Sequence, residues 1–433
     1  MNLAIYMNGL FVGTLSKSNN GALSFLYDKD WIRHPAGRPL SLSLPLQTAP
    51  HKGPEVFNYF ENLLPDSKAL RERIQSRLKI RSSHPFDLLH SIGRDCVGAI
   101  QLVEENEKPT EPRLDGVVLD DENIAQTLAQ FEHLPLGMSR EEKDFRISLA
   151  GAQEKMAFLR RGCEWLRPLG NTPTSHIFKL PIGRLTQHGI DLSTSCENEW
   201  LSLKIAQAMG FDVANAEIAN FKSQKVLIVE RFDRRLSSDG KVLLRLPTED
   251  FCQTFGISGA LKYESDGGPG IVECMERLQG SQFATQDRHT FFRVQILFWM
   301  LAAIDGHAKN FSLYLKAQDQ YALAPLYEIL SAYPLFANKS LQKQKAKMAM
   351  ALKGKNSQYH WSRIQVRHFF STAKLCGLSE KLVTKWLEEM AECALTICET
   401  MPSTLPKDFP KEVSQAIFDG LKQQALKIQT ALS

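Results

Sequence analysis

The apolar and polar positions at the start of the chain predict β structure followed by helices. Residues 3–15 form two β-prone runs on either side of Asn8-Gly9, a strong hairpin signal because both central positions of the turn need positive φ. Apolar residues then recur at helical spacing over 57–80. These patterns predict a small α+β subdomain over residues 1–103.

After residue 103 the pattern of apolar and polar residues changes twice. Residues 104–122 hold acidic side chains and two prolines without a sustained period, so we predict an acidic connector and a helix over 104–140. Short β-prone runs then surround one helical run that stops at Gly210, as helices often do. A strand-rich lobe with one inserted helix is therefore expected over 141–246. Its β-prone runs are 146–161, 176–180, 216–220 and 226–229.

Past Leu246 the pattern becomes mainly helical. This predicts a helical C-terminal lobe over residues 247–433. The run 290–304 is apolar on nearly all sides, so we expect a buried helix there that ends at Ile304.

Composition narrows the class of protein. Of 433 residues, 43% are hydrophobic and 23% charged, which excludes collagens, disulfide mini-proteins and disordered proteins. The longest apolar run, 296–304, is far shorter than the ~18 residues of a membrane span, and the N-terminus does not resemble a secretory signal. We expect a cytoplasmic protein with no membrane partner. The eight cysteines lack Cys-x-x-Cys spacing and are expected to be reduced, mostly buried thiols.

A polar hexapeptide after the predicted buried helix is the first candidate for chemistry. Asp305 and Asn310 are separated by four residues, as protein kinases space the catalytic base and a magnesium ligand. One tight loop can hold a carboxylate against the attacking hydroxyl and an amide oxygen against the metal. A polar turn that only caps the helix, with Gly306 at the bend, explains the same residues.

Other residues follow the order of the parts of a kinase. Lys179 lies in an apolar strand and precedes Glu197 and Glu199 on a helix, an arrangement that kinases use to hold phosphates. Glu199 is the better candidate by position, although helix capping explains either glutamate. Small residues within 148–155 let backbone N–H groups approach phosphate oxygens. Glu328 stands where a kinase has its second metal carboxylate, but its additional methylene moves the oxygens outward.

Several longer motifs occur in one order along nearly the whole chain. They occupy residues 38–45, 86–89, 145–155, 176–181, 229–234, 262–270 and 305–310. Together they resemble the HipA family of kinase toxins. The resemblance implies an α+β, protein-kinase-like two-lobed fold with an additional N-terminal β-rich subdomain and a mainly helical C-terminal lobe.

The resemblance also implies an ATP-dependent serine/threonine protein kinase that uses magnesium. Asp305 is then the base, while Asn310 and Glu328 bind Mg²⁺, although the family has aspartate at position 328. Ser148 matches the family's autophosphorylated serine, whose modification inactivates the enzyme. Glu199 is expected to pair with Lys179. The nucleotide-binding positions, including the adenine hinge at Glu230 and Phe232, are Ala150, Gly151, Ala152, Gln153, Glu154, Lys155, Lys179, Glu230, Phe232, His307, Lys309, Asn310, Tyr327 and Glu328.

The partners implied by the resemblance are a protein substrate and an antitoxin. The family acts as the toxin of a bacterial toxin–antitoxin pair, and a dimeric DNA-binding antitoxin holds it on operator DNA. The substrate would be a component of translation, with glutamyl-tRNA synthetase as one candidate.

A basic stretch bears on DNA contact. Residues 329–379 contain nine basic and no acidic residues. A solvated face explains this simply, whereas a contact with nucleic-acid phosphates is the alternative. No helix-turn-helix signature is present, so base reading would fall to the antitoxin. The DNA-contact candidates are Lys339, Lys343, Lys345, Lys347 and Lys374.

Two functions therefore remain open. The chain is either an active protein kinase or a nucleotide-binding, catalytically impaired co-repressor that acts mainly through the antitoxin–DNA complex. Glu328, in place of the family aspartate, is the residue that discriminates between them.

Overall fold

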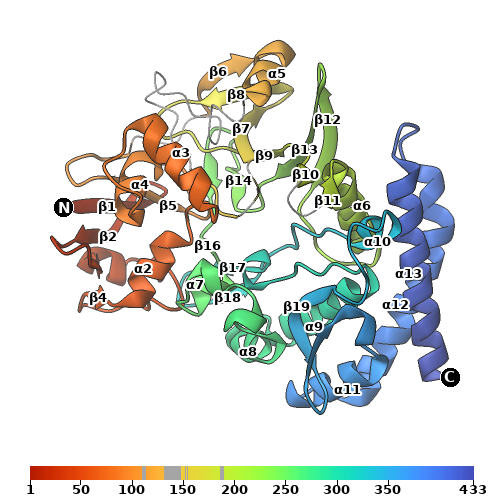
Figure 1. Ribbon diagram of the computed structural model, residues 1–433. Helices are drawn as coiled ribbons and strands as arrows, with labels where there is room; N and C mark the ends of the chain where they lie inside the picture. Colours follow the sequence, from red (N-terminus) through yellow and green to blue (C-terminus); the bar gives the residue numbers. More distant parts are fainter. Residues whose placement is uncertain (110–113, 131–147, 152, 154, 186–189) are drawn as a thin grey trace. The chain divides into compact units, whose positions relative to one another are not determined.

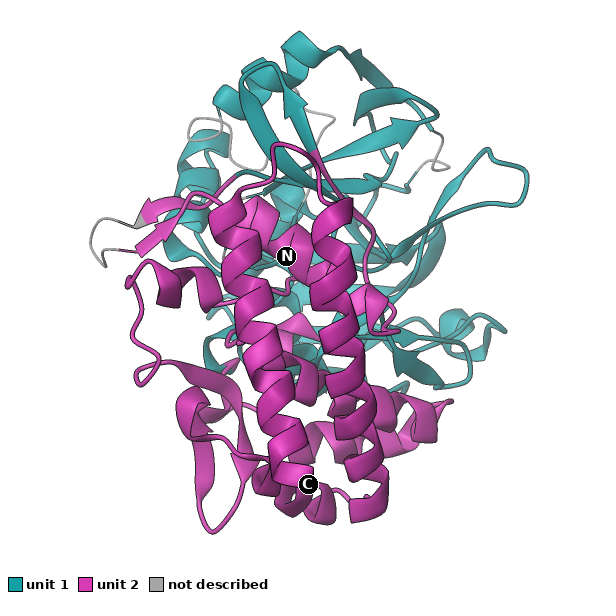
Figure 2. Cartoon of the chain, turned by 90° about the vertical axis from the view of Figure 1, so that its right-hand side faces the viewer, with its two compact units in different colours: residues 1–180, 219–261, 312–324 teal, residues 181–218, 262–311, 325–433 magenta. Residues whose placement is uncertain are grey.

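The computed structural model describes residues 1–433 apart from 110–113, 131–147, 152, 154 and 186–189. The described chain divides into two compact units, each assembled from three segments (Figure 2). Unit 1 comprises 1–180, 219–261 and 312–324, and unit 2 comprises 181–218, 262–311 and 325–433. Each unit is therefore discontinuous in sequence. The predicted division into four consecutive parts, 1–103, 104–140, 141–246 and 247–433, stays a prediction.

The N-terminal part of unit 1 is built on a five-stranded antiparallel sheet, ordered β4-β3-β2-β1-β5 (Figure 1). The predicted hairpin is confirmed, because β1 and β2 pair across Asn8 and Gly9, whose φ values are 46° and 83°. The strands are β1 (Asn2–Met7), β2 (Leu10–Lys17), β3 (Leu23–Tyr27), β4 (His51–Lys52) and β5 (Ile100–Glu104).

Helices pack on this sheet around a core that includes Phe25, Phe60 and Phe86. Two helices account for the predicted helical region 57–80, and Ser67 caps the second through the N–H of Leu70. The helices are α1 (Lys29–Arg33), α2 (Pro54–Glu61), α3 (Lys68–Leu78) and α4 (Pro85–Ile92).

A six-stranded sheet follows, ordered β12-β13-β9-β7-β8-β6, and it confirms the predicted β-prone runs 176–180, 216–220 and 226–229. Among its described residues, the run 146–161 is a strand only from Lys155, because the chain before it bonds to other segments, as the N–H of Ser148 does to the carbonyl oxygen of Asp95. Its apolar face, with Phe158 and Phe178, packs against Ile124 and Leu128 of α5 (Asp121–Ala129). The prediction of a connector and a helix over 104–140 missed a strand, because this stretch also supplies the edge strand β6. The strands are β6 (Gly116–Leu119), β7 (Lys155–Arg161), β8 (Glu164–Pro168), β9 (His176–Lys179), β12 (Ala216–Phe221) and β13 (Gln224–Glu230).

Two smaller β elements and a short helix complete unit 1. A two-stranded hairpin follows β13 in the chain, and a three-stranded sheet has the order β16-β17-β18. The elements are β14 (Arg234–Leu236), β15 (Leu243–Arg245), β16 (Thr248–Asp250), α7 (Phe251–Thr254), β17 (Ser312–Leu315) and β18 (Tyr321–Leu323).

Unit 2 is mainly helical, and α12 and α13 lie side by side along it (Figures 1 and 2). None of the helices in the described ranges is long and apolar enough to cross a membrane. Its elements are β10 (Gly183–Leu185), β11 (Ile190–Leu192), α6 (Ser195–Ala208), α8 (Ile271–Arg277), α9 (Ala284–Met300), α10 (Tyr333–Ala337), β19 (Lys347–Lys353), β20 (Ser357–His360), α11 (Val366–Leu375), α12 (Glu380–Thr400) and α13 (Lys411–Leu432).

The C-terminal ends of two helices in unit 2 can be compared with the ends predicted from the sequence. Helix α6 ends as predicted before Gly210, whose φ is 83°. Helix α9 is buried as predicted, but its expected end at Ile304 is wrong: the helix ends at Met300, and Ala302 has a φ of 47°. Apolar residues continue past the helix because the irregular backbone after it is also buried.

The cysteines behave as expected. All eight are free thiols, and five of them are buried. Cys163 is the exposed one, and Cys393 and Cys398 are half-buried.

A buried carboxyl group lies on β16. The Glu249 side chain is fully buried, and its Oε1 accepts a hydrogen bond from the backbone N–H of Leu42 over 2.9 Å. Burial disfavours the ionised form and raises the pKa of Glu249 to about 7. Between about pH 4.5 and 7 the folded chain therefore keeps a proton that the unfolded chain has released.

This group should make the free energy of unfolding fall as the pH rises from about 5 to 8, since the folded state binds the extra proton. The substitution Glu249→Gln removes the titration and keeps an acceptor for Leu42. We expect it to match the wild type at pH 5 and to be about 2–3 kcal/mol more stable at pH 8, measured by urea unfolding. Glu276→Gln, at an exposed position of α8, is the control and should behave alike at both pH values. An equal effect of Glu249→Gln at both pH values would contradict the assignment.

Candidate active site

The predicted catalytic loop lies in unit 2, after α9, and is closed by its own hydrogen bonds. The Asn310 side-chain amide donates to the carbonyl oxygen of Asp305 over 2.8 Å, and the N–H of His307 donates to the same carbonyl over 2.8 Å. Residues 308–310 form one turn of 3₁₀ helix. The Asp305 side chain is exposed, whereas Asn310 is buried. The loop thus presents a carboxylate to solvent and keeps an amide oxygen beside it.

Gly306 is required by packing inside this loop. A Cβ at this position would lie 2.2 Å from the ring of Phe298, a buried residue of α9. Any larger residue would push the loop away from the helix. The glycine therefore does more than provide the bend that the sequence suggested.

A second segment of unit 2 joins the loop. The Tyr327 hydroxyl donates to the carbonyl oxygen of Lys309 over 2.8 Å, so the residue that precedes Glu328 in the sequence is bonded to the loop. Glu328 has a φ of 54°, in the left-handed region that aspartate and asparagine enter more readily than glutamate. The role of Asn310 and Glu328 as a metal-binding pair stays a prediction, and the backbone at position 328 suits an aspartate better than a glutamate.

These residues fit magnesium by their chemistry. Mg²⁺ prefers hard oxygen ligands and is commonly bound by one or two carboxylates together with substrate phosphates and water. Asn310 provides an amide oxygen, and Glu328 provides a carboxylate. The ion would supply charge neutralisation on the phosphates when it is bound.

Two buried lysines lie on neighbouring strands of the six-stranded sheet. Lys155 of β7 and Lys179 of β9 are directly opposite in the antiparallel pairing, so they project from the same face of the sheet. Only 6% and 4% of their surfaces are exposed. Their predicted role in binding nucleotide phosphates stays a prediction.

The predicted phosphate loop is attached to the N-terminal part of unit 1. The N–H of Asp66 donates to the carbonyl oxygen of Gly151 over 2.9 Å, and Gly151 has a φ of 106°. The Gln153 side chain donates to the carbonyl oxygen of Leu180 over 2.9 Å. Ala152 and Glu154, two of the predicted nucleotide-binding residues, lie outside the described residues.

Ser148 is also held from the N-terminal part. Its side chain is fully buried, and its hydroxyl donates to the carbonyl oxygen of Leu63 over 2.7 Å. Its backbone N–H donates to the carbonyl oxygen of Asp95 over 2.9 Å. No other molecule can reach this hydroxyl unless the segment first leaves its position.

The predicted adenine hinge follows directly from β13. Glu230 is exposed at the end of the strand, and Phe232 is half-buried. The hydroxyl of Tyr314 donates to the carbonyl oxygen of Phe232 over 3.0 Å, and the two rings meet edge to face. The neighbours Arg231 and Asp233 point instead into the interior.

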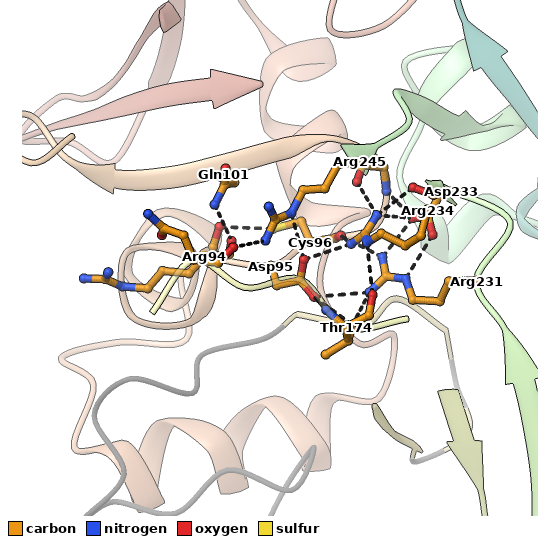
Figure 3. Close-up of polar contacts among 12 residues, drawn as sticks. Arg94, Asp95, Cys96, Gln101, Thr174, Arg231, Asp233, Arg234 and Arg245 are labelled. Atoms are coloured by element: carbon orange, nitrogen blue, oxygen red, sulfur yellow. Dashed lines mark hydrogen bonds and ion pairs between the residues drawn. The ribbon is translucent and has the colours of Figure 1, made fainter. Parts of the chain in front are cut away.

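That interior holds a cluster of five buried charges, two aspartates and three arginines (Figure 3). Asp95 accepts hydrogen bonds from Arg234 over 2.9 Å and from Arg245 over 3.0 Å. Asp233 accepts from Arg231 over 2.8 Å. Burial alone would raise the pKa of Asp95, but the guanidinium groups outweigh it and hold that pKa well below its ordinary value. We call these five residues the ionic cluster.

The ionic cluster also binds the main chain of the N-terminal part. The carbonyl oxygen of Cys96 accepts from both Arg231 and Arg234 over 2.9 Å, and the N–H of Gly98 donates to Asp233 over 2.7 Å. The hinge backbone therefore cannot shift without breaking bonds to residues 95–98.

Several predicted roles stay predictions. Lys179 belongs to unit 1 and Glu199, a buried residue of α6, belongs to unit 2, so their pairing is not tested. The DNA-contact candidates are all exposed. Within the same basic stretch, Lys353 instead pairs with Glu264 over 2.5 Å.

Other residues of the site were missed from the sequence. Tyr263 lies in a recognised motif but had no role, and its hydroxyl donates to Asp305 over 2.6 Å. Asp95 had no local signal at all. Arg231, Asp233 and Arg234 lie in the recognised motif 229–234 but had no role, and their charges beside the predicted hinge were the further signal.

Comparison with known proteins covers both parts of the chain. A family model described as the HipA-like C-terminal domain matches residues 147–397, and one described as the HipA N-terminal domain matches residues 3–103. The protein Y4mE of Sinorhizobium fredii is 33% identical over 339 residues, which cover 77% of this chain and 78% of Y4mE. The serine/threonine-protein kinase toxin HipA of Shewanella oneidensis is 28% identical over 343 residues, covering 76% and 75%.

A solved structure shares the fold. The complex of Shewanella oneidensis HipA, HipB and its operator DNA contains a chain that matches with a TM-score of 0.79 at 22% identity, covering 98% of this chain and 96% of that chain. The predicted fold class is therefore confirmed.

The ionic cluster predicts a large effect of Asp95→Asn. The substitution leaves three buried guanidinium groups with one carboxylate, and breaking a buried ion pair on one side costs about 3–5 kcal/mol. We expect a loss of this size in the free energy of unfolding, measured by urea denaturation. Glu164→Gln, which breaks the exposed pair with Arg161, is the matched control and should cost less than about 1 kcal/mol. Equal costs for the two variants would contradict the assigned role of the cluster.

Proposed function

The chain belongs to the HipA family of kinase toxins, and from this we propose that it is an ATP-dependent serine/threonine protein kinase acting as the toxin of a bacterial toxin–antitoxin pair. The observation that carries the proposal is the loop in unit 2, where an exposed Asp305 carboxylate and the Asn310 amide share one short turn, to which Tyr327 is bonded through Lys309.

The proposed roles follow from this arrangement and from the charges of unit 1. Asp305 accepts the proton of the acceptor hydroxyl, while Asn310 and Glu328 bind magnesium. The buried Lys155 and Lys179 bind phosphate oxygens of ATP. Magnesium–ATP supplies the phosphoryl group when bound. The remaining proposed nucleotide contacts are Ala150, Gly151, Gln153, Glu230, Phe232, His307, Lys309 and Tyr327.

Phosphorylation of Ser148 is proposed to inactivate the enzyme. A phosphate carries a charge of about −1.5 to −2 and cannot remain where the hydroxyl now donates to the Leu63 carbonyl oxygen. The modified residue would have to leave and would carry the attached phosphate loop with it. Because Ser148 must be released before it can react, we propose transfer from another copy of the enzyme.

The proposed partners are a DNA-binding antitoxin, operator DNA bound through it, and a protein substrate in translation, with glutamyl-tRNA synthetase as one candidate. The resemblance to a chain found with HipB and operator DNA supports the first two. The exposed lysines at 339, 343, 345, 347 and 374 would add salt-sensitive affinity without reading bases.

The role of Asp305 predicts a loss of rate without a loss of nucleotide affinity. Asp305→Asn should lower kcat by a factor on the order of 10²–10⁴, because a general base acts on the acceptor hydroxyl. The affinity for magnesium–ATP should change by less than about twofold. Mass spectrometry of the purified protein with ATP and magnesium measures transfer and shows whether Ser148 is labelled. Asp408→Asn, at an exposed aspartate before α13, is the control. A parallel loss of ATP affinity would refute the role.

Glu328 predicts a gain of function. Glu328→Asp should raise kcat by up to about a hundredfold, because a misplacement of about 1 Å can cost that much and aspartate also suits the positive φ. Glu328→Gln keeps the length but removes the charge, so it should lower kcat.

The same comparison separates the two candidate functions. A wild type that binds ATP without transfer, together with an active Glu328→Asp, would support the co-repressor function. An unchanged rate in Glu328→Asp would instead show that the surroundings suit glutamate or that this residue is not a metal ligand.

A further inference from the structure

One tyrosine of unit 2 contacts the proposed catalytic base directly. The Tyr263 hydroxyl donates a hydrogen bond to Oδ1 of Asp305 over 2.6 Å. Asp305 is an exposed residue, and this bond engages its Oδ1. The base therefore has one oxygen bound by the tyrosine and a second oxygen outside this hydrogen bond.

The tyrosine is held tightly against the catalytic loop. The N–H of Ala308 donates to the carbonyl oxygen of Lys262 over 3.1 Å, and the Tyr263 ring meets His307 edge-on with the centroids 5.0 Å apart. The Tyr263 carbonyl oxygen accepts from the N–H groups of Asp266 and Gly268, each over 3.0 Å. Backbone and ring are thus both constrained.

The next residue, Glu264, ties this segment to the strand β19. Its carboxylate accepts from the N–H of Ala351 over 2.6 Å and from the Lys353 ammonium over 2.5 Å. Gly270 lies close on the other side, where an added Cβ would come within 2.5 Å of the Glu264 carboxyl carbon. Tyr263 is consequently presented from a rigid support.

We propose that Tyr263 is a positioning residue that orients the Asp305 carboxylate so that Oδ2 receives the proton of the acceptor hydroxyl. This inference rests on the proposed kinase function. A carboxylate on an exposed loop can rotate about its side-chain torsions, and a charge-assisted hydrogen bond to one oxygen restricts that rotation. If Tyr263 blocked the site of the acceptor hydroxyl, it would have to move before each transfer. The contacts of Lys262 and Glu264 instead hold it in place, which fits a residue that orients the base.

The test measures phosphoryl transfer by the full chain with magnesium–ATP. The substitutions are made in the wild type or in Glu328→Asp, whichever has the higher kcat. Tyr263→Phe removes the hydroxyl and keeps the ring, so kcat should fall about tenfold or more, the effect of one charge-assisted hydrogen bond. The KM for ATP should stay within about twofold, because the substitution removes only the hydroxyl on the base and keeps the ring that meets His307. Tyr6→Phe is the matched control, since Tyr6 lies on β1 of unit 1 and belongs neither to the catalytic loop nor to the segment that supports Tyr263, and it should leave kcat unchanged.

The outcomes separate this inference from the proposed function. A fall in kcat confined to Tyr263→Phe, at constant KM, supports the positioning role. An unchanged kcat overturns it while the kinase function stands, and a raised kcat overturns it by showing that the tyrosine blocks the acceptor. A parallel rise in KM shows a general structural role and also overturns it. Absence of transfer in every background overturns the proposed function and this inference together.

Discussion

The burial of five charges at the ionic cluster is the constraint on which unit 1 depends. Asp95 and Asp233 are removed from water together with three arginines, and such charges are tolerated only when each is paired and hydrogen-bonded. The pairing joins residues 95–98 to the chain that follows β13. The N-terminal part is therefore built into the same unit as the predicted hinge and is not an appendage to it.

The same N-terminal part holds the predicted phosphate loop through its own main-chain atoms. Asp66 binds the carbonyl oxygen of Gly151, Leu63 accepts from the Ser148 hydroxyl, and Asp95 accepts from the Ser148 N–H. Unit 2 uses the same principle, since Tyr327 and the segment carrying Tyr263 both bind the backbone of residues 305–310. Each half of the proposed chemistry is thus oriented by residues that do not take part in it, which is how precise geometry is usually maintained.

Local pattern predicted those elements whose signals lie within a few residues. The Asn8-Gly9 hairpin, the end of α6 before Gly210 and the buried α9 were all evident from spacing and residue type. The end of α9 was not, because periodicity cannot distinguish a buried helix from the buried irregular chain that follows it. Strand β6 was hidden by its acidic surroundings, since edge strands tolerate charged neighbours.

The sequence by itself determined the kinds of groups available: an aspartate and an asparagine at kinase spacing, a lysine in an apolar strand, and a glutamate in place of the expected aspartate. Only the tertiary structure decided which distant residues orient them. Tyr263 is 42 positions from Asp305, and Asp95 is 150 positions from Arg245. The spacing of residue types along the chain predicts contacts within one turn of helix or between two paired strands. Residues that are tens of positions apart come into contact only when the whole unit packs together.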